Sequence, residues 1–123
     1  MHSDAYREIQ RLLDLLPDSI HDILRLSENF VAHGEWDLGV ELLRRASVAS
    51  GDSRLGIALG TLFARMGRHK DAMSQMMQVL KQEPENGEAL LQMAASLYAV
   101  KESARAEQML EKALQHGVSP ERV

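Results

Sequence analysis

The stretch LGTLFARMGRHKDAMSQMMQVLKQEP, residues 59–84, contains the spacing of small, apolar and turn residues that decides the fold. Its key positions are Leu59, Gly60, Phe63, Gly67, Ala72, Met76, Val79 and Pro84. A shift of about 34 residues toward the C-terminus gives Met93, Ala94, Leu97, Lys101, Ala106, Leu110, Ala113 and Val118. A shift of about 33 residues toward the N-terminus gives Leu26, Ser27, Phe30, Gly34, Gly39, Leu43 and Ala46. A fixed period of this length indicates stacked copies of one structural unit.

Each copy contains segments in which apolar residues recur at helical spacing. These segments predict helices over about 4–16, 20–33, 36–49, 53–66, 69–82, 87–100 and 103–116. The glycines that suit positions after helix ends are Gly34, Gly67 and Gly117. The residues that can cap the following helices are Asp18 or Ser19, Asp52 or Ser53, and Asn86. No stretch alternates apolar and polar residues as a strand does, so we expect an all-α fold.

The pattern resembles the tetratricopeptide repeat, a helix–turn–helix unit with a Leu-Gly pair, a later aromatic residue, a turn glycine and a closing proline. Ala5, Ile9, Leu12 and Pro17 reproduce the spacing of the second helix of such a unit. The chain departs from the family at Ile23, Gly56 and Leu90, which replace an early aromatic residue. It also lacks a closing proline at residues 50–53.

This resemblance implies a right-handed α-solenoid of stacked helix–turn–helix repeats with about seven helices. The whole chain, residues 1–123, is then one domain. Its parts are an N-terminal half-repeat at 4–17 and repeats at 20–52, 53–86 and 87–120. Because a single helix pair cannot bury its own apolar face, stacking of neighbouring pairs has to supply the stability. We expect the N-terminal helix to pack through Ile9, Leu12, Leu13 and Leu16.

Tetratricopeptide arrays bind other proteins, and the first helix of each pair lines a concave groove. The matching residues here are Leu24, Glu28, Val31, Ile57, Thr61, Ala64, Arg65, Leu91, Ala95 and Tyr98. One subclass of the family holds a C-terminal carboxylate with a lysine and an asparagine. Leu24 and Glu28 stand at those places and cannot donate to a carboxylate. The resemblance therefore implies a groove that takes an apolar or amphipathic segment of a partner.

The composition narrows the functional classes further. The chain has 123 residues, 45% of them hydrophobic, no cysteine and a formal net charge of −4. The acidic balance argues against nucleic acid as a partner, because such binding depends on cations that contact phosphates. The longest uncharged run, Leu55 to Ala64, is too short to span a membrane, and no signal-peptide core is present. The absence of cysteine is compatible with a cytoplasmic location, which we expect.

We find no pattern that predicts catalysis, a metal site or a cofactor. The five histidines lack the helical spacing of a metal-binding pair. Glu83 and Glu85 flank Pro84 in a loop, without the apolar surroundings in the sequence that a pair of acid–base carboxylates needs. No nucleophile elbow or glycine-rich phosphate loop occurs. We therefore expect a protein that is not an enzyme and that has neither a cofactor nor a metal.

Two surface features have two interpretations each. Met73 and Met77 lie one turn apart on an outer helix, where they either complete the packing or form a secondary apolar contact. Met76, Met93 and Met109 fall on core positions of the repeat. The cluster of Arg65, Arg68, His69 and Lys70 is either a solvated turn or a contact for an acidic partner.

Two functional classes stay open. The first is an adaptor or chaperone-like protein that covers an apolar segment of a partner. The second is a structural subunit that forms homo-oligomers through the open ends of the solenoid, or a fragment of a longer array.

Overall fold

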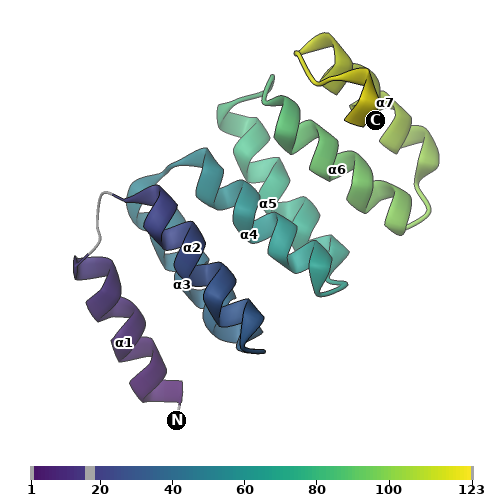
Figure 1. The fold of residues 1–123 in the computed structure, drawn as a ribbon. Helices are drawn as coiled ribbons and strands as arrows, with labels where there is room; N and C mark the ends of the chain where they lie inside the picture. The colour runs from purple at the N-terminus through teal and green to yellow at the C-terminus, as the bar shows by residue number, and fades with distance from the viewer. Residues whose placement is uncertain (1, 16–18, 123) are drawn as a thin grey trace. The chain divides into compact units, whose positions relative to one another are not determined.

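The computed structural model describes residues 2–15 and 19–122. Over these residues the chain is helical and contains no strand. The elements are α1 (His2–Leu15), α2 (Ile20–Ala32), α3 (Trp36–Ser50), α4 (Ser53–Arg65), α5 (His69–Gln82), α6 (Gly87–Ala99), α7 (Ser103–Gln115) and the 3₁₀ helix η1 (Pro120–Arg122). Figure 1 shows these elements in chain order. The all-α fold class is confirmed, and the described ends of the seven predicted helices lie within about two residues of the predicted ends.

The chain divides into two compact units, Met1–Ala58 and Leu59–Val123. We refer to them as unit 1 and unit 2. The division falls inside α4, so it does not coincide with the predicted repeat boundary at residue 53.

Unit 1 contains α1, α2, α3 and the beginning of α4. α2 and α3 form a packed helical hairpin, and α1 packs against α3. Ile9 of α1 is fully buried and Leu13 is half-buried, so the N-terminal helix packs on the unit through two of its four predicted contacts. The other two, Leu12 and Leu16, lie outside the described side chains. The apolar side chains buried on α2 and α3 are Ile23, Val31, Leu42, Leu43 and Ala46.

Unit 2 contains the end of α4 followed by α5, α6 and α7. α6 packs against both α5 and α7. The helices α4 and α5 approach most closely at Gly60. A β-carbon added there would lie 2.5 Å from Cε of Met76 and 3.3 Å from the carbonyl oxygen of Ala72. Gly60 therefore lies in a close crossing of α4 and α5, and no side chain larger than hydrogen fits at residue 60 without displacing its neighbours.

Five described residues at helix ends have positive φ, and the turns at four of them, all except Gly51, share one hydrogen-bond pattern. Gly34, Gly67 and Gly117 have φ of 78°, 79° and 91°, as their positions after helix ends predict. Lys101 adopts the same conformation, with φ of 70°. The residue after each donates to a carbonyl five positions back, and these bonds are Glu35 to Phe30, Arg68 to Phe63, Glu102 to Leu97 and Val118 to Ala113. Lys101 thus performs the role of glycine in its turn.

The predicted N-caps are also present where the chain is described. The Ser19 hydroxyl accepts from the Asp22 N–H at 3.2 Å, and the Asn86 amide oxygen accepts from the Ala89 N–H at 3.0 Å. The carboxylate of Asp52, and not Ser53, accepts from the Arg54 N–H at 2.8 Å. The alternative cap Asp18 lies outside the described residues. These bonds satisfy helix N–H groups that have no partner within the helix.

Candidate functional site

The predicted groove residues of unit 1 lie on α2 and at the beginning of α4. Leu24 and Ile57 are half-buried and Glu28 is exposed, so they contribute surface. Val31 is only 8% exposed, and its side chain therefore packs inside the fold and offers little to a partner.

In unit 2 the predicted residues of α6 form an apolar surface. Leu91 is half-buried, whereas Ala95 and Tyr98 are exposed, with 42% of Tyr98 accessible. Their spacing places all three on one side of α6. The core side of the helix is occupied by Leu90, Met93, Ala94 and Leu97. An aromatic ring beside small apolar residues is the kind of surface that supplies large contact area to a partner.

The predicted residues on the end of α4 are less apolar. Thr61 and Ala64 are half-buried, and Arg65 is exposed. The Arg65 side chain already interacts within the chain. The structure therefore locates the predicted residues on α2, α4 and α6, the first helices of the three predicted repeats, and a common groove through all of them stays a prediction.

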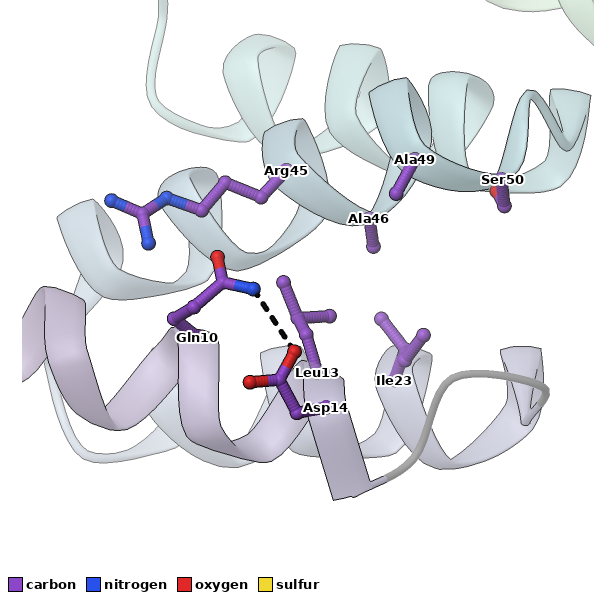
Figure 2. Close-up of a pocket in the computed structure, with 8 residues that line it drawn as sticks. All are labelled: Gln10, Leu13, Asp14, Ile23, Arg45, Ala46, Ala49 and Ser50. Carbon is purple, nitrogen blue, oxygen red and sulfur yellow. Dashed lines mark hydrogen bonds between the residues drawn. The ribbon is translucent and has the colours of Figure 1, made fainter.

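A pocket of about 650 Å³ lies in unit 1 between α1, α2 and α3. Its lining residues are Gln10, Leu13, Asp14, Ile23, Arg45, Ala46, Ala49 and Ser50 (Figure 2). Gln10 donates from Nε2 to Oδ1 of Asp14 at 3.2 Å, so these two side chains of α1 are held together at one wall. The small side chains of Ala46 and Ala49 leave the space open. No pattern in the sequence predicted this pocket.

Two arginines of α3, Arg44 and Arg45, are held by the carboxylate of Glu41. Glu41 is 8% exposed and accepts hydrogen bonds from Arg44 at 2.6 and 2.7 Å and from Arg45 at 2.8 Å. Burial tends to raise the pKa of Glu41, but the hydrogen bonds and positive charges of the two arginines outweigh it and lower the pKa. The guanidinium of Arg45, which lines the pocket, is therefore anchored within its own helix.

Two members of the basic cluster, Arg65 at the end of α4 and Arg68 before α5, interact within the protein. Arg68 lies 4.6 Å from the ring centroid of Phe63 and donates to Asp71 at 2.8 Å. The Nδ1 atom of His69 is buried and has no hydrogen-bond partner among the described residues. Lys70 is the member that faces solvent without an ion pair in the part of the chain that the structure describes.

The burial of the methionines follows their repeat positions, except that Met109, on a predicted core position, is not fully buried. Met76 and Met93 are buried, and Met109 is half-buried. Met73 is half-buried and Met77 is 53% exposed, so the outer side of α5 has an accessible apolar side chain.

Within residues 2–15 and 19–122, no helix has both the length and the apolar character that crossing a bilayer requires.

Residues 63–123 match the family described as tetratricopeptide repeat. A comparison with curated protein sequences finds no match. Among solved structures, a point mutant of MamA shares 22% identity and a TM-score of 0.71, covering 93% of this chain and 84% of that one.

Two other similar structures contain peptides. The first TPR of Spaghetti (RPAP3) bound to the HSP90 peptide SRMEEVD shows 14% identity and a TM-score of 0.72, covering 81% of each chain. The Yersinia enterocolitica type III secretion chaperone SycD, in complex with a peptide of the translocator YopD, shows 22% identity and a TM-score of 0.72. That match covers 85% of this chain and 81% of SycD. The resemblance to the tetratricopeptide repeat is thus confirmed by sequence over residues 63–123, and the similar solved structures share the fold over most of the chain.

Proposed function

We propose that this protein is a non-enzymatic interaction module, an adaptor or chaperone-like protein that binds an apolar or amphipathic segment of a partner protein. The observation that carries the proposal is the apolar surface of α6, where Leu91, Ala95 and Tyr98 share one side of the helix and Tyr98 is 42% exposed. Exposed apolar area of this kind is covered favourably by a partner.

Two similar structures support a peptide as the ligand. SycD is in complex with a peptide of a translocator, and the RPAP3 repeat domain is bound to the acidic peptide SRMEEVD. The second mode fits this chain poorly, because Leu24 and Glu28 provide no donor for a terminal carboxylate and Glu28 adds a negative charge. We therefore favour an apolar or amphipathic segment over an acidic C-terminus as the ligand of this surface.

The acidic composition and the lack of cysteine support a cytoplasmic protein that keeps its partner from aggregating. Shielding is the function that an apolar binding surface can provide without catalysis. The same reasoning leads us to propose that nucleic acid is not a partner.

The test uses the purified full chain as bait in a native extract, followed by identification of the captured protein. Leu91→Glu combined with Tyr98→Glu places two charges on the α6 surface and should reduce capture of that protein at least tenfold. The matched control adds the same charges at exposed positions of α7, by Gln108→Glu combined with Gln115→Glu. Circular dichroism checks that both variants keep their helix content. Equal capture by both variants would contradict the proposed surface.

The alternative, a self-associating subunit or part of a longer array, has one observation in its favour. Leu114 on α7, the last α-helix, is 40% exposed and lies one turn from the half-buried Leu110. Light scattering on the purified chain distinguishes the two functions. An oligomer that dissociates in Leu114→Glu supports self-association, whereas a monomer at all concentrations supports the adaptor.

A further inference from the structure

The outward side of α5 contains a group of residues that the proposed binding surface does not use. Lys70, Met77 and Lys81 are exposed and follow one another at helical spacing, with the half-buried Met73 beside them. Ala72, Met76 and Val79 point to the opposite side and are buried. We call Lys70, Met73, Met77 and Lys81 the lysine–methionine face.

Lys70 and Lys81 carry positive charges that are not held in ion pairs. Neither makes an ion pair with any residue in the ranges 2–15 and 19–122. The acidic residue of α5, Asp71, is engaged by Arg68 at 2.8 Å. Arg105 on α7 pairs in the same way with Glu102 at 2.8 Å. The four residues of the lysine–methionine face therefore present two positive charges and no negative one, although the chain as a whole has a net charge of −4.

The apolar part of the face lies between the two charges. Met77 is 53% exposed, and Met73 lies one turn before it. An unbranched thioether side chain adapts its shape to a partner and suits contacts with varied apolar side chains. A surface with methionines at its centre and cations at both ends is complementary to an apolar stripe that has carboxylates at both ends.

The dimensions favour a helix of a partner protein over a lipid surface. Lys70 and Lys81 are separated by roughly 16 Å along the helix axis, at 1.5 Å per residue, which about three turns of a second helix match. Recognition of an anionic bilayer by a basic segment generally takes about 4–8 cationic residues, more than this face presents.

We propose that the lysine–methionine face of α5 binds an acidic amphipathic helix of a partner protein. Apolar side chains of that helix cover Met73 and Met77, and its carboxylates pair with Lys70 and Lys81. This contact is separate from the α6 surface and does not depend on the function proposed for it.

The test uses two labelled alanine-based helical peptides and the full chain carrying Leu91→Glu and Tyr98→Glu, which removes the α6 surface proposed above for amphipathic segments, with binding followed by fluorescence anisotropy. Both peptides have the same central leucines. One has glutamates about 11 residues apart at the ends of the leucine stripe, and the other has lysines there. The glutamate peptide should bind, and its affinity should fall several-fold as salt shortens the Debye length. The lysine peptide should not bind at the same concentrations.

Charge reversal provides the decisive variant. In Lys70→Glu combined with Lys81→Glu, the affinity for the glutamate peptide should fall at least tenfold and the lysine peptide should now bind. Met77→Glu should also lower the affinity for the glutamate peptide. Lys112→Glu, which reverses an exposed lysine of α7, should leave the affinity unchanged. Because the α6 surface is removed in every chain tested, loss of binding in these variants reports on the lysine–methionine face alone.

Three outcomes would overturn the proposal. The first is a glutamate peptide that does not bind, or that binds equally to the charge-reversed chain. The second is binding to phosphatidylserine vesicles that the charge reversal abolishes, which would assign the face to a lipid surface. The third is a change in the oligomeric state of the chain on charge reversal, which would assign the face to a second copy.

Discussion

Repeats 53–86 and 87–120 use the same pattern but fill two equivalent positions with side chains of different size. Gly60 in repeat 53–86 corresponds to Ala94 in repeat 87–120, and Met76 corresponds to Leu110. A β-carbon at residue 60 would lie 2.5 Å from Cε of Met76, whereas Ala94 is fully buried with its β-carbon present. We therefore expect the side chain of Met76 to limit the size of the residue at position 60.

The largest expected effect comes from breaking this correspondence at Gly60. Gly60→Leu forces α4 and α5 apart and should lower the free energy of unfolding by about 3 kcal/mol or more, the upper end of overpacking costs. Glu107→Leu, on the exposed side of α7, should change it by less than about 0.5 kcal/mol. Urea unfolding followed by circular dichroism measures both, and equal shifts would disprove the assigned register.

A smaller change at the same position acts as its control. Gly60→Ala in the Met76→Leu background reproduces the alanine and leucine found at Ala94 and Leu110 in repeat 87–120. It should cost less than Gly60→Ala alone by about 0.5 kcal/mol or more, because the shorter side chain withdraws from the added methyl group. Additive effects would show that Met76 is not the residue that limits the size at residue 60.

Repeat 20–52 differs from the two later repeats at Glu41. Its equivalents are Ser74 and Gln108, both exposed, whereas Glu41 is buried and binds Arg44 and Arg45. Removing the negative charge by Glu41→Gln leaves the arginine donors poorly paired. It should cost about 1–2 kcal/mol at pH 7, since both arginines keep partial contact with water.

The same substitution has a signature in the pH dependence of stability. The pKa of Glu41 in the folded chain lies below its ordinary value of 4.5, so the unfolded chain binds more protons at this group. Its contribution to stability is present above about pH 4.5 and is lost as the pH falls through the folded pKa. The difference between wild type and Glu41→Gln should therefore shrink on acidification. The pKa of Asp52 is also lowered, chiefly by hydrogen bonding to Arg54, so both chains should retain some acid sensitivity.

The fold was predictable because its signals are local and repeated. Glycines after helices, capping side chains and apolar spacing each specify a helix boundary, and a repeated period corrects errors in any one copy. The pocket was not predictable, because it depends on how far α1 lies from Ala46 and Ala49, and sequence spacing does not encode that distance. Val31 shows the same limit, since its repeat position suggested the binding surface while its packing buries it. The burial of Glu41 was likewise invisible in a pattern that treats charged residues as exposed.

The smallest expected effect concerns the turns, where the two later repeats differ at one residue. Gly67 and Lys101 have nearly the same φ, 79° and 70°, and the turns they form share the same hydrogen-bond pattern. Glycine adopts this conformation without steric cost, whereas the β-carbon of lysine approaches a backbone carbonyl. Lys101→Gly should therefore raise the free energy of unfolding by about 0.5–1 kcal/mol, a net gain after the greater chain entropy of glycine in the unfolded state.

The reciprocal substitution makes this last comparison symmetrical. Gly67→Lys should lower the free energy of unfolding by a similar amount, because it introduces at residue 67 the same β-carbon strain that Lys101 has. Both changes should shift the urea midpoint while leaving the denaturant slope unaltered, since the exposed surface on unfolding stays the same. If Lys101→Gly lowers the midpoint, the lysine side chain stabilises its turn by contacts that outweigh the backbone cost. The turn residue would then be selected for its side chain and not for its conformation.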